Sequence, residues 1–423
     1  MTSARPLFDS PAPKGYATGT TRTRAPAETL ALIEPLVARF GVTRLANITG
    51  LDRIGIPVYQ AVRPNARSLS VSQGKGLDAP SAQVSALMES LESYHAEHAR
   101  CAVRLESQRA LAREARVADP TRLPLARGTH YQPDAPLPWT AARDLRSDEP
   151  VFVPFEIVHA NFTVPRVPGS GAFSPSTSGL GSGNHIAEAT LHGICELIER
   201  DAETLWRIAG GEAGSAYRVA PESIDYAPAR ALVERFKAAG LDVMIWDMTS
   251  DVQVAAFSVI VFDPESDADL NPSPAADGSG AHPDRDVALC RALTEAAQSR
   301  LTAIAGSRDD FTLALYQGTQ RAEVLDHFRT LARAPAERSF EEVPVFRGES
   351  IDDDLEHVLD RLAGRGMSEV LVIDLSSPEL AETPGLRFAR TVVVGLETSI
   401  ASPSYAPRER ALARLAALEA AGA

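Results

Sequence analysis

The chain has 423 residues, 44% of them hydrophobic and 23% charged, which is ordinary for a globular protein of two or three compact units. Its net charge of −14, from 42 basic and 56 acidic side chains, argues against partners such as nucleic acid or an anionic membrane. Three widely spaced cysteines argue against a disulfide framework or a zinc knuckle. With no apolar signal region at the N-terminus and no run of about 20 apolar residues, we expect a cytoplasmic protein.

The first half of the chain alternates irregular segments with short apolar runs. In chain order, the sequence predicts an irregular arm over residues 1–25, a helix over Glu28–Phe40, strands at Ile54–Val62 and Ser68–Ser72, a helix over Pro80–Arg100, a proline-rich irregular stretch over 118–150 and a strand at Pro150–His159.

The second half is richer in helices. In chain order, the sequence predicts a Gly/Ser-rich loop over Gly169–Asn184, helices over Ile186–Trp206 and Ala227–Ala239, strands at Asp242–Trp246 and Val252–Phe262, a polar loop over Asp263–Asp286, helices over Val287–Ala305 and Ile351–Arg365, a strand at Glu369–Asp374 and a helix over Glu409–Ala423. Because strands and helices do not alternate regularly, the expected fold class is α+β. We expect an arm and helix over 1–44, a catalytic domain over 45–400 that could divide into two lobes near 150–170, and a C-terminal helix over 401–423.

Three of the predicted helices carry polar residues at the same spacing. An α-helix turns about 100° per residue, so positions 0, +4, +7 and +11 share one face. The stripes are Ser85, Glu89 and Glu92; Glu188, His192 and Glu199, with Glu196 at the edge; and Arg291, Glu295 and Gln298. These helices are otherwise apolar, which indicates burial. Carboxylates that converge in a buried place need a cation, and Mg²⁺ takes oxygen ligands and bridges to phosphates. The pattern therefore favours a Mg–nucleotide site, although any one such pair alone is usually a solvent-exposed face.

Two glycine-containing segments lie just before the first two of these helices. In the segment 72–76, glycines permit close approach of phosphate and Lys75 supplies a positive charge. The segment 178–184 ends at Asn184, which would also suit a helix cap. Neither segment is a Walker or GxGxxG motif, and a plain turn is the alternative for the first.

Taken together, these segments resemble the YcaO family, over roughly residues 45–400. The family pattern SxxxExxE appears as Ser85 to Glu92, the Asn-plus-Glu helix as Asn184 to Asp201, and the helix with Glu and Gln as LTEAAQSRL at 293–301. The resemblance implies an α+β fold whose helices line a Mg–ATP cavity. It implies that Glu89, Glu92, Glu188, Glu196 and Glu199 coordinate Mg²⁺ or contact ATP. It places Ser85, Asn184, Arg200, Glu295 and Gln298 in the same pocket, with Arg22 or Arg24 of the arm as phosphate contacts.

The chemistry that the resemblance implies starts at a backbone amide of a peptide or protein. A nucleophile adds to the carbonyl carbon, the resulting oxyanion takes the γ-phosphoryl group of ATP, and phosphate then leaves to give an azoline, thioamide or amidine. No covalent enzyme nucleophile is required, so we assign no catalytic residue. Cys195 then fits core packing, and His192 fits a structural role.

Two segments point to a subgroup of the family. The stretches Leu51–Val58 and Arg390–Glu397 resemble members that form thioamides with a TfuA partner, except that Val394 replaces the usual proline. The chain ends in Ala420-Ala-Gly-Ala423 and not in the proline-rich tail of many ring-forming members. We therefore expect a TfuA-like or peptide-recognition partner, and family resemblance is compatible with a homodimer. The alternatives are an ATP-binding accessory factor for ribosomal-protein methylthiolation, or another ATP-driven reaction such as ligation, amidine formation or cleavage.

Overall fold

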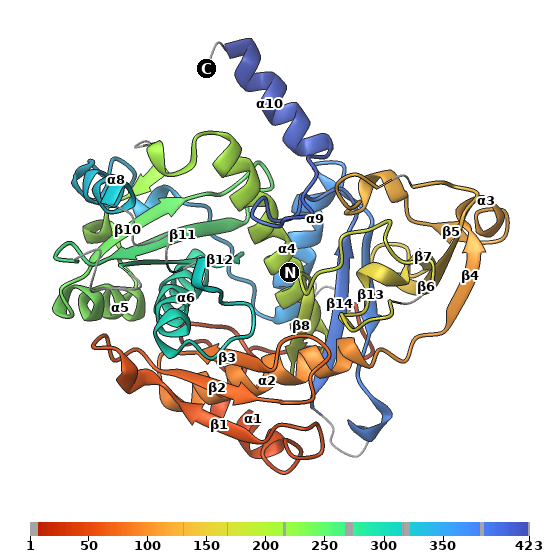
Figure 1. The fold of residues 1–423 in the computed structure, drawn as a ribbon, viewed down its shortest axis with the longest axis horizontal. Coiled ribbons are helices and arrows are strands. Elements are labelled where there is room, and N and C mark those ends of the chain that lie inside the picture. Colours follow the sequence, from red (N-terminus) through yellow and green to blue (C-terminus); the bar gives the residue numbers. More distant parts are fainter. Residues whose placement is uncertain are drawn as a thin grey trace.

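The computed structural model describes residues 7–129, 131–166, 168–214, 217–266, 274–314, 316, 322–380 and 385–421. Within these ranges the strands form three separate sheets (Figure 1). The first sheet has the order β1 (Arg44–Asn47), β2 (Val58–Val62), β3 (Val71–Lys75), and the second has the order β12 (Ala275–His282), β11 (Ala255–Phe262), β10 (Asp242–Asp247), β9 (Arg218–Val219). The third sheet has the order β5 (Arg116–Val117), β7 (Pro150–Pro154), β6 (Pro136–Asp144), β13 (Val370–Asp374), β14 (Arg387–Val393), β8 (Leu180–Gly183). In the third sheet β4 (Val103–Ser107) also pairs with β6.

Helices pack against and between these sheets. They are α1 (Pro26–Ile33), α2 (Ala79–Glu97), α3 (Gln108–Leu111), α4 (Ile186–Ile208), α5 (Ala227–Ala238), α6 (Arg285–Ala305), α8 (Ala322–Arg333), α9 (Ile351–Ala363) and α10 (Glu409–Ala421). Among the described strands every pairing is antiparallel except that of β5 with β7. The predicted α+β class is therefore confirmed.

Each sheet contributes one edge strand that runs directly into a long helix. These three strand–helix units are β3 with α2, β8 with α4 and β12 with α6. Each helix packs on its own edge strand and also contacts the edge strand of another unit: α2 contacts β8, α4 contacts β12 and α6 contacts β3. The contacts are thus cyclic, and the three polar-striped helices meet at the centre of the molecule (Figure 1).

Glycines set the distance between strand and helix in each unit. A Cβ atom added to Gly74 would lie 1.9 Å from the backbone nitrogen of Ala86, and one added to Gly181 would lie 2.1 Å from the carbonyl oxygen of Ala189. A Cβ added to Gly278 would lie 2.3 Å from the backbone nitrogen of Ala296. Strand and helix backbones therefore touch directly, which only glycine allows.

Most predicted elements are present with shifted ends. The first helix stops at Ile33 because Pro35 interrupts the helical hydrogen bonds, and turns follow. Of the strand predicted at Ile54–Val62, only Val58–Val62 pairs with neighbours. The strand predicted at Pro150–His159 ends at Pro154, where a short 3-10 helix begins.

Three segments predicted to be irregular contain strands, and those predictions were wrong. β8 lies in the predicted loop Gly169–Asn184, and β12 lies in the predicted loop Asp263–Asp286. Both strands consist mainly of Gly, Ala and Ser, residues that favour turns unless a close helix demands small side chains. β6 lies in the proline-rich stretch 118–150 and is held by strands on both sides, β7 on one and β4 with β13 on the other. The strands before and after residues 150–170 share one sheet, and the division into domains stays a prediction.

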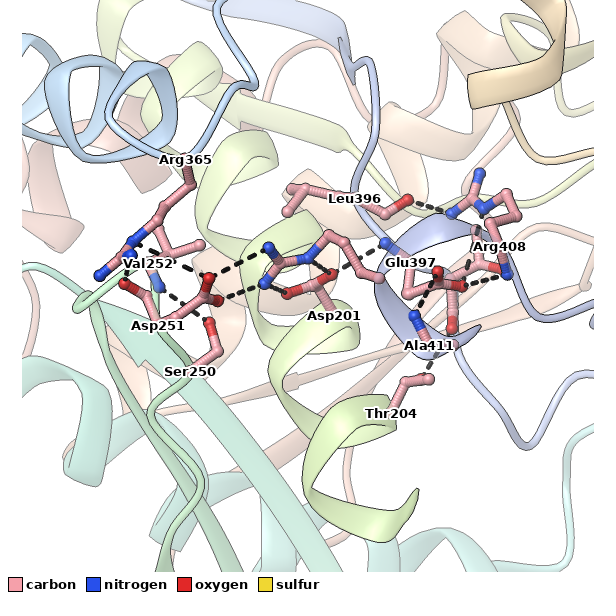
Figure 2. Close-up of polar contacts among 12 residues, drawn as sticks. Asp201, Thr204, Ser250, Asp251, Val252, Arg365, Leu396, Glu397, Arg408 and Ala411 are labelled. Atoms are coloured by element: carbon pink, nitrogen blue, oxygen red, sulfur yellow. Dashed lines mark hydrogen bonds and ion pairs between the residues drawn. The ribbon is translucent and has the colours of Figure 1, made fainter. Parts of the chain in front are cut away.

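Among the described residues, the contacts that anchor the C-terminal helix lie at its start. The Glu397 carboxylate accepts hydrogen bonds from the backbone N–H groups of Ala411, at 3.0 Å, and Arg408, at 3.3 Å (Figure 2). Beyond this point α10 leads away from the body of the molecule (Figure 1), and Leu412 is 55% exposed. No helix in the described ranges combines the length and apolar character that crossing a membrane would require.

Candidate functional site

The polar stripes of α2, α4 and α6 line one cavity of about 900 Å³. This cavity, called the main cavity below, brings together all eleven residues predicted for the site: Lys75, Ser85, Glu89, Glu92, Asn184, Glu188, Glu196, Glu199, Arg200, Glu295 and Gln298. Arg22 and Arg24 of the N-terminal arm line it as well.

The opposite faces of the same helices are buried in different cores. Leu87 and Leu91 of α2 pack in the core between the first and third sheets. Ile198 of α4 packs with residues of α9, and Leu293 of α6 packs beneath the second sheet. Burial of each such side chain stabilises the fold by roughly 1.5–3 kcal/mol. The amphipathic pattern therefore turns each polar stripe toward the common cavity.

Glu89 and Glu92 of α2 are acidic groups with unusual ionisation. Burial raises the pKa of Glu89 to about 7, against the lowering effects of Lys75 and Arg308. Burial also raises the pKa of Glu92 to about 7, although a hydrogen bond from the Ser182 hydroxyl lowers it. Burial disfavours the ionised form of both carboxyl groups near neutral pH. A bound divalent cation would stabilise that ionised form.

Glu188, on the first turn of α4, binds the N-terminal arm. Its Oε1 accepts a hydrogen bond from Arg22 Nη1 at 3.1 Å. Its Oε2 accepts bonds from the backbone N–H of Thr23 at 2.9 Å and from the Thr23 hydroxyl at 2.8 Å. The weakly matched arm therefore forms part of the site. His192, one turn further on, lies between Arg22 and Arg291, and burial together with these cations lowers its pKa well below the ordinary value.

Arg200 is the cation at the centre of the acidic cluster on α4. Its guanidinium lies 3.4 Å from Glu199 and 3.9 Å from Glu196. Burial alone would lower the Arg200 pKa, but the surrounding carboxylates raise it. Burial raises the pKa of Glu199, whose two oxygens accept bonds from the Ser279 hydroxyl and the backbone N–H of Ala281, both at 3.1 Å. Glu199 therefore ties α4 to β12.

Lys75 and Glu295 join the first unit to the third. The ammonium group of Lys75 donates to Glu295 at 2.6 Å. Burial would raise the Glu295 pKa, but Lys75 and Arg200 hold it below its ordinary value. The side-chain oxygen of Gln298, one turn along α6, is buried with no hydrogen-bond partner in the described structure. The main cavity thus offers an unused polar acceptor beside paired charges.

The predicted metal ligands line the cavity without forming a finished coordination sphere. In the described part of the chain, no group of three or more His, Cys, Asp or Glu side chains is arranged to hold a metal ion. The role of the five glutamates as ligands therefore stays a prediction. The cap of α4 is His185, whose ring accepts from the backbone N–H of Ala187, while Asn184 hydrogen bonds with Thr29.

Sequence reasoning did not assign several cavity residues that the fold brings in. Ser182 lines the cavity from the unpredicted strand β8. Ser279, on the unpredicted strand β12, supports the cavity residue Glu199 through a hydrogen bond from its hydroxyl. Arg291 belongs to the stripe on α6 and Arg308 follows that helix, and both line the cavity. The signal that could have found the serines is that each stands directly before a glycine, in a segment that ends at a polar-striped helix.

Comparisons with known proteins identify the family. The family model described as YcaO cyclodehydratase, ATP- and Mg²⁺-binding, matches residues 73–397. A Rhizobium leguminosarum bv. trifolii protein, described as an uncharacterized protein in the tfuA 3′ region, is 36% identical over 385 residues, covering 90% of this chain and 89% of that protein. An uncharacterized protein of Methanothermobacter thermautotrophicus is 34% identical over 389 residues, covering 90% and 97%.

Solved structures share the fold. The structure of YcaO from Methanopyrus kandleri, bound with AMPPCP and Mg²⁺, matches with a TM-score of 0.73 and 22% identity, over 94% of this chain and 98% of that one. A heterocyclase in complex with substrate and cofactor matches with a TM-score of 0.72 and 20% identity, over 93% of this chain and 55% of that one. This chain therefore spans about half the length of that heterocyclase.

The chain belongs to the YcaO family. The YcaO domain binds ATP and Mg²⁺, so the predicted cofactors are confirmed at the level of the family. The expected YcaO-type fold is confirmed too.

Proposed function

We propose that this protein uses ATP and Mg²⁺ to activate backbone amides of a ribosomally made peptide or protein, and that the product is a thioamide formed with a TfuA-like partner. The observation that carries the proposal is the convergence of three polar-striped helices on one cavity of about 900 Å³. Both cations and carboxylates line it, and this combination suits a triphosphate held through divalent cations.

The proposed reaction balances with a sulfide-level nucleophile. Sulfide adds to the amide carbonyl carbon, and the carbonyl oxygen becomes an oxyanion. That oxygen takes the γ-phosphoryl group as ADP leaves. The C–O bond then breaks to release phosphate, the S–H proton passes to solvent, and C=S forms. Arg200 and Arg291 are placed to offset negative charge in the cavity, and Mg²⁺ would supply further charge stabilisation when bound.

The five glutamates predicted as metal ligands differ in how many of their carboxylate oxygens already accept hydrogen bonds. Glu188 and Glu199 use both carboxylate oxygens on donors from the described chain, so we assign them to positioning. Glu92 uses one oxygen on Ser182, and Glu196 uses one on the backbone N–H of Gly179. We propose that Glu89, Glu92 and Glu196 would each supply ligands to Mg²⁺ together with the phosphates of ATP, because their remaining oxygens suit a hard cation.

The cysteines do not suit covalent catalysis. Burial raises the pKa of both Cys195 and Cys290 to about 12, so both thiols stay protonated at neutral pH. A protonated, buried thiol is a poor nucleophile and a poor sulfur carrier. Burial raises the pKa of the third cysteine, Cys101, as well. A sulfur source outside this chain fits these thiols, which supports a partner protein. The relative in the tfuA 3′ region favours a TfuA-like identity for that partner.

We also propose that residues 45–400 form the catalytic domain, with the 1–44 arm closing one wall of the cavity through Arg22. The Arg22–Glu188 ion pair, at 3.1 Å, supports this role of the arm.

The test is mass spectrometry of a peptide encoded beside the gene, after incubation with ATP, Mg²⁺, a sulfide source and the TfuA-like protein. Replacement of one oxygen by sulfur is the expected mass change, and loss of water would instead identify azoline formation. Nucleotide binding without turnover under every condition would overturn the enzymatic proposal and favour an accessory factor.

A further inference from the structure

A second pocket, of about 280 Å³, lies beside the main cavity. Phe162 and Pro175 line both spaces, so the two adjoin across these apolar side chains. Phe162 is 44% exposed, unusually open for a phenylalanine, and this leaves its ring free to contact a ligand. We call this second space the side pocket.

His159 lines the side pocket with an unused hydrogen-bond donor. The residue is only 7% exposed, and its Nδ1 accepts a hydrogen bond from the backbone N–H of Asn161 at 3.1 Å. An accepting Nδ1 in a neutral ring places the proton on Nε2. That Nε2 is buried and has no hydrogen-bond partner among the described residues. Burial, with Arg390 nearby, lowers the His159 pKa and so favours the neutral ring.

A second polar group of the side pocket also lacks a hydrogen-bond partner among the described residues. The hydroxyl of Ser170 is buried, lines the pocket and has no partner in the described structure. Buried polar groups are nearly always hydrogen-bonded, so two unsatisfied groups around one space are available to an acceptor atom that enters it. Both can donate, and the ligand therefore has to accept.

The charges of the side pocket favour a neutral ligand. The Glu156 carboxylate already accepts from three backbone N–H groups, those of Gly171, Ala172 and Phe173. Arg166, which also lines the pocket, offsets its negative charge. With His159 neutral, one cation and one anion leave no excess charge to attract a carboxylate or phosphate.

We propose that the side pocket binds a backbone carbonyl of the peptide substrate, with His159 Nε2–H and the Ser170 hydroxyl as donors, so that a neighbouring amide of the peptide reaches the main cavity across Phe162 and Pro175. The inference rests on the proposed function, because it names where the substrate of that reaction is held. A peptide segment is complementary to the side pocket because it carries neutral acceptor oxygens and apolar surface.

The test follows the nine histidines of the full chain, labelled with ¹⁵N, by NMR. Titration with N-acetylglycine-N′-methylamide, a blocked residue with two amide carbonyls, should shift the His159 Nε2–H resonance in a saturable way. The His159→Phe variant assigns that resonance. His327, whose side chain is 55% exposed, serves as an internal control and should not move. A shift produced by acetate or inorganic phosphate but not by the amide, or no shift with any probe, would overturn the proposal.

Variants test the donors separately. Ser170→Ala removes a hydroxyl that has no partner in the described chain, so it should fold normally while weakening binding of the amide by about five- to tenfold. Ser147→Ala, at an exposed turn, is the matched control and should leave binding unchanged. Equal affinity in Ser170→Ala and Ser147→Ala would remove Ser170 from the pocket.

Titration with Mg²⁺ and AMPPCP separates this inference from the proposed function. If the wild-type protein binds this nucleotide but the His159 Nε2–H resonance does not shift on addition of the amide, only the side-pocket assignment fails. If the protein does not bind the nucleotide, the proposed function fails whatever the amide does. Ser170→Ala should bind the nucleotide with wild-type affinity, since Ser170 lies outside the main cavity.

Discussion

Arg410, in the first turn of the C-terminal helix, forms two parallel hydrogen bonds to the carboxylate of Asp201 on α4. The distances are 2.8 Å from Nε and 2.9 Å from Nη2. The Asp201 side chain is fully buried and follows Arg200, a residue of the main cavity, in sequence. Arg410 also reaches Asp251, so one guanidinium joins α4 to the turn before β11 (Figure 2 shows both carboxylates). The first turn of α10 is therefore fixed to the helix that carries much of the site.

Removing this cation should destabilise the protein strongly. Arg410→Gln leaves the buried Asp201 carboxylate without its partner, and breaking a buried ion pair in this way costs about 3–5 kcal/mol in the free energy of unfolding. Urea denaturation measures it. The control is Arg365→Gln, because Arg365 contacts the same Asp251 where both side chains are 47% exposed, and such pairs contribute less than about 1 kcal/mol. Similar losses in the two variants would contradict the argument.

Neutralising cavity glutamates should stop the use of ATP while leaving the fold intact. Glu89→Gln and Glu199→Gln keep the size of the side chain but remove charge from the main cavity. We expect Mg²⁺-dependent ATP turnover to fall by about 10²–10³-fold, with an unchanged circular dichroism spectrum. Glu106→Gln, on strand β4 outside the cavity, is the control and should keep wild-type turnover. Normal turnover in both cavity variants would remove these residues from the site.

The raised pKa values of Glu89 and Glu92 predict a pH-dependent stability. Each carboxyl group has an ordinary pKa of 4.5 and a folded-state pKa of about 7, so the folded protein retains these protons between the two values. Their contribution to the free energy of unfolding is therefore largest below the ordinary pKa and falls as pH rises through about 7. Glu92→Gln, which cannot ionise, should gain stability relative to the wild type as pH rises from about 5 to about 8.

Denaturation curves across this pH range, with and without Mg²⁺ and AMPPCP, measure the effect. The nucleotide complex should stabilise the wild type more at high pH, because a divalent cation binds ionised carboxylates. Parallel pH profiles for the wild type and Glu92→Gln would contradict the raised pKa.

A methyl group added at a strand–helix contact should disrupt the site by displacing the helix that carries its residues. In Gly278→Ala the new Cβ would meet backbone atoms of α6, which cannot move aside as a flexible side chain could. We expect a loss of about 1–3 kcal/mol in stability and weaker nucleotide binding, since Glu295 lies on the displaced helix. Gly50→Ala is the control: an added Cβ there meets nothing within 4 Å, so thermal denaturation should be nearly unchanged.

The helices and their polar faces were predictable because periodicity is a local property. The spacing of Glu89 and Glu92, or of Glu295 and Gln298, fixes one face of a helix whatever the rest of the chain does. Once the apolar faces enter separate cores, these polar faces have to point to the remaining common space. All eleven predicted residues consequently line the main cavity.

The strands that complete the cavity were not predictable because their small residues are required by contacts with other elements of the fold, and these contacts are not visible in the local sequence. Gly181 and Gly278 resemble loop glycines until a helix is known to touch them. The same is true of the arm, where Thr23 meets Glu188 across 165 residues of sequence. The side pocket also depends on tertiary placement, since nothing near His159 in sequence marks its free Nε2.

The direct backbone contacts at Gly74, Gly181 and Gly278 also limit how the enzyme can move. With no layer of side chains between strand and helix, neither can slide or tilt against the other. Each pair then behaves as one rigid block, and the space between the three helices can change through rotation of whole blocks at the junctions of α2 with β8, α4 with β12 and α6 with β3. Residues at those three junctions would then govern how the three helices move relative to one another.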